Sequence, residues 1–398
     1  MLSILCRKVL QTPTQSPLFL RFLQIQFPKS ISSQISNCTT EQPSSLTLSY
    51  LINTCGLSPQ AALSASQKVH LKSTQKPDSV LQFLKNHGFN NTHIANLIAF
   101  RPRFLLANVE STLQPKIQFF QSLGLSDPEL AELIASNPHM LYQSLKFQLI
   151  PSVSFLRSLL ETNENVVKAL KRSRWLFSSD LNKTMRPNIN FLRELGVPNS
   201  RIAKMVMTQP RTLMQKLDSL REITERVAAF GFERGSLLFM WAIHAMCSLS
   251  KSTWAAKVKL LKSLGWSEEN VFDAFRRVPM YMMCSEKKIR SGMDFFGKKM
   301  QWEPSLISQR PKLLMYSMKK RVIPRSRVWE ILKCKELAKE EELIKMLDLK
   351  EDRFLNKYVT KYEQEIPYLM KVYEGKLEFK WLDAKGSQIR NPCDVVRR

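Results

Sequence analysis

The sequence predicts an all-α fold: a superhelical solenoid of tandem three-helix repeats, each about 35 residues long, with a positively charged groove. Three observations support this prediction. Similar windows recur at steps of 32 to 36 residues along most of the chain. Glycine is scarce, with 11 in 398 residues, whereas proteins average about 7% and a large β-protein needs glycine for its turns. The 60 Lys and Arg residues outnumber the 34 Asp and Glu residues, giving a formal net charge of +26.

Residues 1–40 have the composition of an organelle transit peptide. They contain Arg7, Lys8, Arg21 and Lys29, no acidic residue, and many Ser, Thr and Gln residues. Organelle import machinery reads cationic, acid-free and potentially amphipathic leaders of this kind. We therefore predict import into an organelle, the mitochondrion first and the chloroplast as the alternative. An ordinary disordered tail is the competing interpretation of the same composition.

The repeat is organised around a centre that is usually proline. Its windows include FRPRFLLAN, NPHMLYQ, QPRTLMQ and RPKLLMY, in which Leu, Met or Phe follows the centre by two or three residues. Because proline lacks a backbone N–H and its ring clashes with the preceding helical turn, each centre is expected to end one helix and precede a short one. The centres are Pro102, Pro138, Arg174, Pro210, Ala245, Pro279 and Pro311.

Apolar residues precede each centre by eight, five and four positions. This i, i+3, i+4 spacing places each trio on one stripe of a helix, which we expect to be buried. The trios are Ile94, Leu97 and Ile98; Leu130, Leu133 and Ile134; Val166, Ala169 and Leu170; Ile202, Met205 and Val206; Leu237, Met240 and Trp241; and Val271, Ala274 and Phe275.

A second proline follows four of the centres by thirteen residues, at Pro115, Pro151, Pro187 and Pro324. Proline is tolerated in the first turn of a helix, so each of these is expected to begin one. That helix is expected to close on a glycine cap, at Gly124, Gly196, Gly231 or Gly265. We predict one array of about eight repeats and a partial C-terminal unit over 50–373, followed by a basic C-terminal tail over 374–398.

These motifs resemble the mitochondrial transcription termination factor (mTERF) family. The PxxLL-type centre, the following Pro-x3-Phe-[FL] and the LG turn are shared with it. The segments LSYLINTCGLSPQAALSASQKV, KPDSVLQFLKNHGF and RFLNKYVTKYEQEIPYLMKVYEGK are similar to its plant organellar branch. The resemblance covers about 45–376 and departs at Arg174 and Ala245, where the centre is not proline. It implies an all-α solenoid whose positive groove binds nucleic acid in organellar transcription or in RNA maturation such as intron splicing, without enzymatic activity.

The charge excess is uneven along the chain. Residues 151–320 hold 30 Lys and Arg against 14 Asp and Glu, a net charge of +16. A one-sided excess on a curved array is the pattern expected for binding a phosphate backbone. The cations that crowd the centres, together with a second cluster expected on the short helix, are our candidate nucleic-acid-binding residues: Arg101, Arg103, Lys171, Arg172, Arg174, Arg211, Arg276, Arg277, Lys287, Lys288, Arg290, Arg310, Lys312, Lys319, Lys320 and Arg321.

Two alternatives apply to these side chains. A cation at the C-terminal end of a helix is also stabilised by the helix dipole, so any single candidate can be a cap instead of a phosphate ligand. Aromatic side chains can stack on bases, and Tyr142 and Trp175, just after two centres, are the ones that we single out for this role.

The sequence offers no catalytic or metal-binding constellation. The seven cysteines are far apart and none forms Cys-x-x-Cys, whereas a zinc site needs close pairs of ligands. His244 and Cys247 lie near each other on an apolar segment, where core packing is the expected role. We expect a monomer that is not an enzyme, has no cofactor and does not cross a membrane. Its expected partner is double-stranded DNA first and structured RNA second, and a helical scaffold that binds another protein is the alternative.

Overall fold

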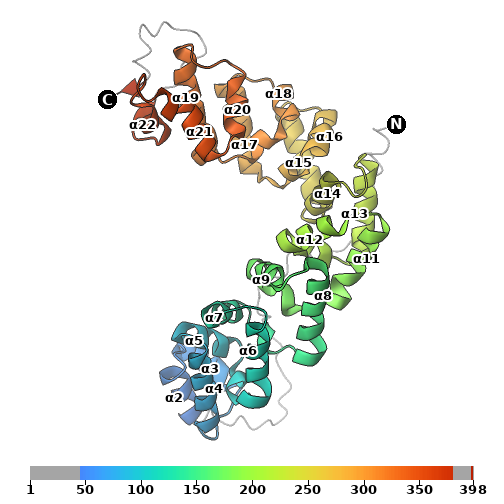
Figure 1. Cartoon of the computed structure of the whole chain (residues 1–398), viewed down its shortest axis with the longest axis vertical. Helices are drawn as coiled ribbons and strands as arrows, with labels where there is room; N and C mark the ends of the chain where they lie inside the picture. Colours follow the sequence, from blue (N-terminus) through green and yellow to red (C-terminus); the bar gives the residue numbers. More distant parts are fainter. Residues whose placement is uncertain (1–44, 380–395, 398) are drawn as a thin grey trace, which may run out of the picture. The chain divides into compact units, whose positions relative to one another are not determined.

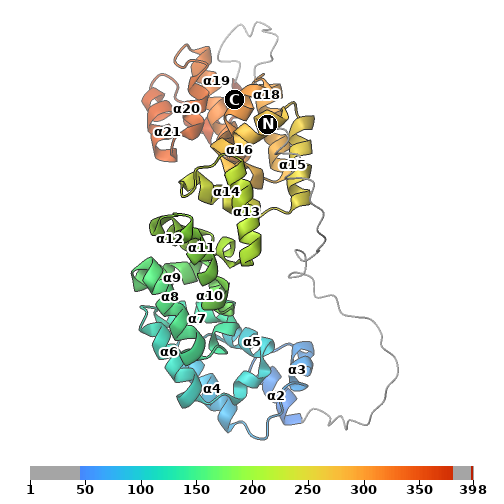
Figure 2. The same cartoon turned by 90° about the vertical axis from the view of Figure 1, so that its right-hand side faces the viewer.

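The computed structural model describes residues 45–379 and 396–397 (Figures 1 and 2). The expected transit peptide, and most of the expected tail over 374–398, lie outside the described residues. The chain divides into two compact units between Glu222 and Ile223, within helix α13 (Leu217–Ala229). We call residues 45–222 the N-terminal unit and the described residues from 223 onward the C-terminal unit. The single array over 50–373 stays a prediction.

The N-terminal unit consists of α-helices that alternate with short 3₁₀ or π-helical turns (Figure 1). In chain order these are α2 (Ser45–Asn53), α3 (Pro59–Ser66), α4 (Gln75–Asn86), α5 (Asn91–Phe100), η1 (Pro102–Leu106), η2 (Val109–Leu113), α6 (Gln114–Gln121), α7 (Asp127–Ser136), η3 (Pro138–Leu141), η4 (Leu145–Leu149), α8 (Ile150–Leu160), α9 (Asn163–Arg172), η5 (Arg174–Ser178), α10 (Leu181–Thr184), α11 (Arg186–Glu194), α12 (Asn199–Thr208) and η6 (Pro210–Met214).

The C-terminal unit continues the series of α-helices and short 3₁₀ or π-helical turns in a less regular order, and it ends in two short paired strands, β1 (Glu378–Phe379) and β2 (Val396–Arg397). The all-α prediction is thus confirmed for the repeats. Between α13 and β1 lie α14 (Leu237–Cys247), α15 (Lys251–Ser263), α16 (Glu268–Arg277), η7 (Pro279–Met283), α17 (Glu286–Asp294), η8 (Phe295–Lys299), α18 (Pro304–Gln309), η9 (Pro311–Met315), η10 (Met318–Val322), α19 (Ile323–Cys334), α20 (Glu342–Asp348), α21 (Glu351–Tyr358), η11 (Thr360–Tyr362) and α22 (Leu369–Tyr373).

Each proline centre is the first residue of a 3₁₀ helix, as the sequence predicts. The residue before each proline centre has an extended φ between −129° and −146°, because a following proline ring disfavours the helical region. Arg174 begins η5 in the same way without a proline. The second and third residues after each of these centres are buried: Phe104 and Leu105, Met140 and Leu141, Leu176 and Phe177, Thr212 and Leu213, Tyr281 and Met282, and Leu313 and Leu314.

The second prolines each occupy the second residue of an α-helix (α6, α8, α11 and α19), in its first turn as predicted. The sequence did not predict the helical turns that precede them. The chain is already helical six residues earlier, in the π-helical turns η2, η4 and η10 or in the short α10. Proline cannot donate to the carbonyl four residues before it and would crowd that carbonyl, and a wider i→i+5 turn moves it aside. Where the equivalent residue is Ile223, Val258 or Gly292, the helices α13, α15 and α17 begin as ordinary α-helices.

The predicted glycine turns are confirmed. Gly124, Gly196, Gly231 and Gly265 have φ of 95°, 79°, 85° and 93°, a region that strains residues with a side chain. At Gly265 space is also lacking, because an added Cβ would lie 2.9 Å from Cγ of Pro304. These turns let the second helix of each pair fold back against the first.

Five of the six predicted apolar trios are fully buried. The trio before Ala245 is not fully buried as predicted, since Leu237 is 43% exposed and Trp241 is half-buried. The reason is local. With no proline at the centre, α14 continues through Ala245 to Cys247 and the chain passes directly to α15. The nearly continuous apolar segment then buries another face, which includes Phe239, Ile243 and His244.

Buried polar donors connect successive repeats. The side chain of Lys116 on α6 donates to the carbonyl of Leu141, at the end of η3, over 2.5 Å. Asn188 on α11 donates to the carbonyls of Leu213 and Gln215, at the end of η6, over 2.9 and 2.7 Å. The last carbonyls of a short helix have no partner within that helix. A donor from the preceding repeat therefore satisfies them.

The C-terminal unit uses the same device, from shifted positions at Lys257 and Lys288 and from the equivalent position at Arg325. Lys257 on α15 donates to the carbonyl of Cys284 after η7, and Lys288 on α17 donates to the carbonyl of Met315 at the end of η9. Arg325, on α19, is fully buried and donates to two carbonyls at the end of α20. Burial lowers the pKa of Lys116 and of Lys257, because desolvation disfavours the charged ammonium.

Replacing Asn188 with Leu is expected to lower the free energy of unfolding by about 2–5 kcal/mol, because two buried carbonyls lose their donor. Ser152 provides the matched control. It occupies the equivalent position on α8 and is buried, and its hydroxyl has no hydrogen-bond partner among the described residues. Ser152→Ala should change stability little. Urea denaturation measures both variants, and equal effects would contradict the role given to Asn188.

Burial lowers the pKa of His244 from its ordinary value of 6.5. The unfolded chain therefore takes up a proton at a higher pH than the folded chain does, and stability should be lost as the pH falls below about 6.5. Thermal unfolding between about pH 7.5 and 5.5 measures this loss. His244→Gln should flatten the dependence, whereas His139→Gln, at an exposed position, should leave it unchanged. An unaltered pH dependence in His244→Gln would contradict this account.

Candidate nucleic-acid interface

The candidate cations lie at the two ends of the 3₁₀ helices. One group is at the end of the preceding helix or in the first turn of the 3₁₀ helix, as the repeat predicts. The other group was expected on the short helix, and this is wrong. Lys287, Lys288 and Arg290 lie in α17, and Lys319, Lys320 and Arg321 lie in η10, so all six belong to the start of the following long helix.

Five of the sixteen candidates are ion-paired with acidic side chains. Lys171 and Arg174 reach back to Glu129 and Glu132 on α7, at 2.5 and 2.6 Å. The hydrogen bond from Lys171 lowers the pKa of Glu129. The remaining three pairs are Lys312 with Asp348 at 3.1 Å, Arg290 with Glu286 at 2.8 Å, and Arg276 with Asp273.

Another set of candidates donates to backbone carbonyls of other elements. The hydrogen bonds run from Arg103 to Lys68, Arg276 to Phe230, Arg277 to Gln309, Lys288 to Met315 and Arg321 to Leu347. These side chains hold neighbouring helices and turns together. Because the accepting carbonyls are not those of the cation's own helix, simple helix capping does not describe them either.

Seven candidates have no hydrogen-bond or ion-pair partner among the described residues: Arg101, Arg172, Arg211, Lys287, Arg310, Lys319 and Lys320. All seven are exposed. Two of them are held flat on aromatic rings, Arg101 at 4.3 Å from the ring centre of Tyr142 and Arg211 at 4.9 Å from that of Trp175. Stacking orders a guanidinium group and leaves its N–H donors available. These seven side chains, the uncommitted cations, can reach a phosphate without breaking a hydrogen bond or ion pair of the protein.

Comparison with protein families matches the mTERF family over residues 81–243 and 240–355. The match covers more than half of the chain and includes both units. This chain belongs to the mTERF family. Comparison with curated proteins gives no match.

mTERF proteins are organellar regulatory proteins that bind nucleic acid through helical repeats, and they are not known as enzymes. Family membership therefore indicates nucleic acid as the class of ligand to consider for the uncommitted cations. Three of them, Arg101, Arg211 and Arg310, directly adjoin a proline centre within the matched residues, and Arg172 lies two residues before the centre at Arg174.

The two aromatic side chains singled out from the sequence are poorly placed for stacking on bases. The rings of Tyr142 and Trp175 are half-buried and are covered by Arg101 and Arg211. Sequence reasoning missed Phe147 in η4, which is 78% exposed. Its position in the mixed sequence LKFQL gave no signal of that exposure.

Metal and membrane chemistry find no support in the part of the chain that the structure describes. No group of three potential ligands gathers there, and no helix is long and apolar enough to cross a membrane. His244 is 6% exposed and packs within α14, as expected for a core side chain.

Replacing Glu129 and Glu132 with Gln should release Lys171 and Arg174 for phosphate contacts. We expect tighter binding to duplex DNA and a log–log salt dependence that is steeper by up to about 1.8, or 0.9 for each cation released. Fluorescence anisotropy at several salt concentrations measures the slope. Glu110→Gln with Glu194→Gln removes the same charge from acids without ion-pair partners among the described residues. An equal change in both double variants would show that only total charge matters.

Proposed function

We propose that this mTERF protein binds double-stranded DNA as a monomer, through phosphate contacts made by the uncommitted cations, and regulates transcription termination in the mitochondrion. The family supports nucleic-acid binding and regulation in an organelle in general. Duplex DNA, termination and the organelle are our inferences.

The observation that supports the proposal most is the separation of the candidate cations into two classes. Nine of the sixteen hold acids or carbonyls of the protein itself, at the distances given above. The seven that remain are exposed, and several directly adjoin a proline corner. Contacts from such side chains to phosphates position a duplex without reading its bases.

Duplex DNA is favoured over single strands because arginine side chains cover the aromatic rings that lie next to the repeat centres. Proteins that bind single strands present ring faces on which bases stack. At the corners, Arg101 and Arg211 occupy the ring faces of Tyr142 and Trp175. The mitochondrion is favoured by the leader composition of residues 1–40, with the chloroplast as the alternative.

Changing Lys287, Arg310, Lys319 and Lys320 to Gln should flatten the log–log salt slope for duplex DNA by up to about 3.6, or 0.9 for each phosphate that is no longer neutralised. The melting temperature should barely move, since none of these side chains holds a protein partner in the described structure. Anisotropy titrations and thermal unfolding of the same variant measure both quantities.

A matched control changes Lys345, Lys357, Lys361 and Lys371 to Gln, which removes the same charge from exposed positions in the last repeats. It should leave most of the slope in place. An equal loss of slope in test and control, or wild-type binding to DNA that does not depend on salt, would contradict the proposal. Salt-independent capture of a protein would instead support the scaffold alternative.

Structured RNA with a single-stranded segment is the second candidate ligand, and Phe147 is the observation that favours it. The ring is 78% exposed and Lys146 lies 5.6 Å from its centre, so a base could stack there while the ammonium group meets the backbone. Intron splicing or another RNA maturation step would follow from this ligand.

Phe147→Ala distinguishes the two ligands. If RNA is bound at η4, the variant should lose about 1–3 kcal/mol of binding free energy for a single-stranded RNA and none for duplex DNA. Phe100→Ala, at a 48% exposed ring packed on His139, is the control. Unchanged RNA affinity in Phe147→Ala would exclude this stacking role and leave duplex DNA as the proposed ligand.

A further inference from the structure

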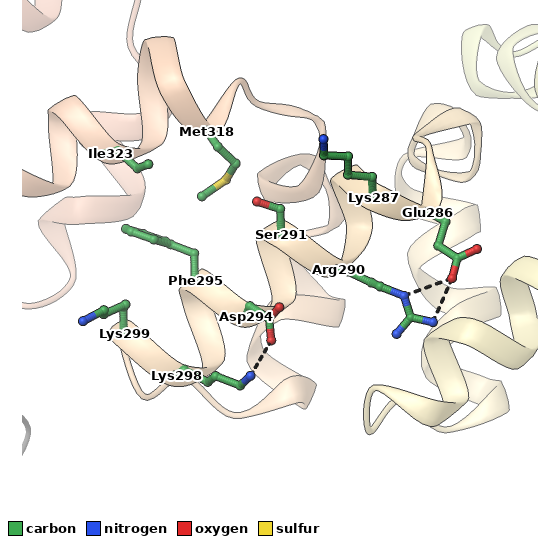
Figure 3. Close-up of a pocket in the computed structure, with 10 residues that line it drawn as sticks. All are labelled: Glu286, Lys287, Arg290, Ser291, Asp294, Phe295, Lys298, Lys299, Met318 and Ile323. Carbon is green, nitrogen blue, oxygen red and sulfur yellow. Dashed lines mark hydrogen bonds and ion pairs between the residues drawn. The ribbon is translucent and has the colours of Figure 1, made fainter.

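The C-terminal unit contains an open groove of about 940 Å³, and none of the proline centres lines it (Figure 3). One wall is α17 with its continuation η8, and the other is formed by Met318 of η10 and Ile323 of α19. The groove therefore runs between the long helices of two successive repeats.

The α17–η8 wall presents a regular stripe of side chains. Lys287, Ser291, Phe295 and Lys299 all line the groove, and side chains four residues apart lie on one face of a helix. The two lysines are twelve residues apart, which corresponds to roughly 18 Å along a helix. The groove is thus as long as a short helical peptide.

The charges along this wall are not uniformly positive. Arg290 is paired with Glu286 at 2.8 Å and Lys298 with Asp294 at 2.9 Å, and all four line the groove (Figure 3). Lys287 and Lys299, at the ends of the stripe, have no ion-pair partner among the described residues. The groove is therefore cationic at its two ends and internally neutralised between them.

The middle of the groove is apolar. Phe295 is 9% exposed, and Met318 and Ile323 are half-buried. The side chains of Met318 and Ile323 lie across the groove from Phe295 (Figure 3). An apolar centre between cationic ends complements a ligand with an apolar stripe and acidic flanks.

We propose that this groove docks an amphipathic helix of a protein partner, with its apolar residues on Phe295, Met318 and Ile323 and its acidic residues at Lys287 and Lys299. This is the helix-in-groove mode of recognition. A nucleic-acid strand fits less well, because its evenly spaced phosphates would face Glu286 and Asp294 and its bases would find only the edge of a buried ring. The proposal concerns a second kind of partner and does not require DNA binding, but it shares Lys287 with the proposed phosphate contacts, so DNA and the partner would compete for that side chain.

The test uses the full chain and a fluorescein-labelled synthetic peptide of about 15 residues, long enough for partial helicity, with Leu at i, i+3, i+4 and i+7 and Glu on the opposite face. A scrambled peptide of the same composition is the reference. Anisotropy should show binding of the amphipathic peptide and weaker binding of the scrambled one. Met318→Gln should weaken binding by about tenfold because less apolar surface is buried, and Lys287→Gln with Lys299→Gln by about tenfold with a reduced salt dependence.

The control, Lys345→Gln with Lys371→Gln, removes two charges elsewhere in the same unit and should bind the peptide as the wild type does. Duplex DNA affinity of Met318→Gln should be unchanged, which separates the apolar part of this groove from the phosphate contacts, in which Lys287 also takes part. Equal binding of both peptides, or an equal weakening in the control, would overturn the proposal. So would a single-stranded oligonucleotide that loses affinity in Met318→Gln while the amphipathic peptide does not bind, which would make the groove a nucleic-acid site.

Discussion

The stacking of repeats depends on buried donors that satisfy the last carbonyls of the neighbouring 3₁₀ helix or turn. Proline stops the helix before each centre, and the short helix that follows leaves carbonyls without an internal partner. Lys116, Asn188, Lys257 and Lys288 fill these positions from the preceding repeat. An unsatisfied buried carbonyl costs about 1–3 kcal/mol, so each such hydrogen bond fixes the register of one repeat against the next. Arg325 does the same for α20, where no proline corner exists.

This arrangement explains why the positive charge excess is only partly available to a ligand. The side chains that connect repeats must be long and must donate hydrogen bonds. Lys and Arg meet both requirements, since they reach from one helix to the carbonyls of the next 3₁₀ helix. Arg277 and Lys288 serve the fold in this way. Lys287, one position before Lys288, lines the open groove and has no such hydrogen bond among the described residues (Figure 3). Adjacent cations on one helix therefore have different roles. Both contribute to the positive field of the protein, but only the second kind has its donors available to a phosphate.

The sequence predicted the features whose physics is local. Proline stops a helix and glycine adopts a positive φ wherever they occur, so the centres at Pro102 and Pro311 and the turn at Gly265 were correctly placed. The π turns were missed, because an i→i+5 closure before Pro115 is one of several ways to relieve the same clash. The buried face of α14 was predicted wrongly because, without a proline at Ala245, nothing in the local sequence marks the end of that helix. The partners of Lys171 and Lys288 lie 42 and 27 residues away, and only the stacked structure brings them together.

Lysine reactivity measures the central claim most directly. The full chain would be acetylated with and without duplex DNA, and modification at each lysine quantified by mass spectrometry. The account predicts that Lys287, Lys319 and Lys320 react readily in the protein alone and are protected by DNA, whereas Lys116 and Lys288, held on carbonyls, react slowly in both states. Protection confined to ion-paired lysines such as Lys171 and Lys312, with Lys287, Lys319 and Lys320 unaffected by DNA, would contradict it.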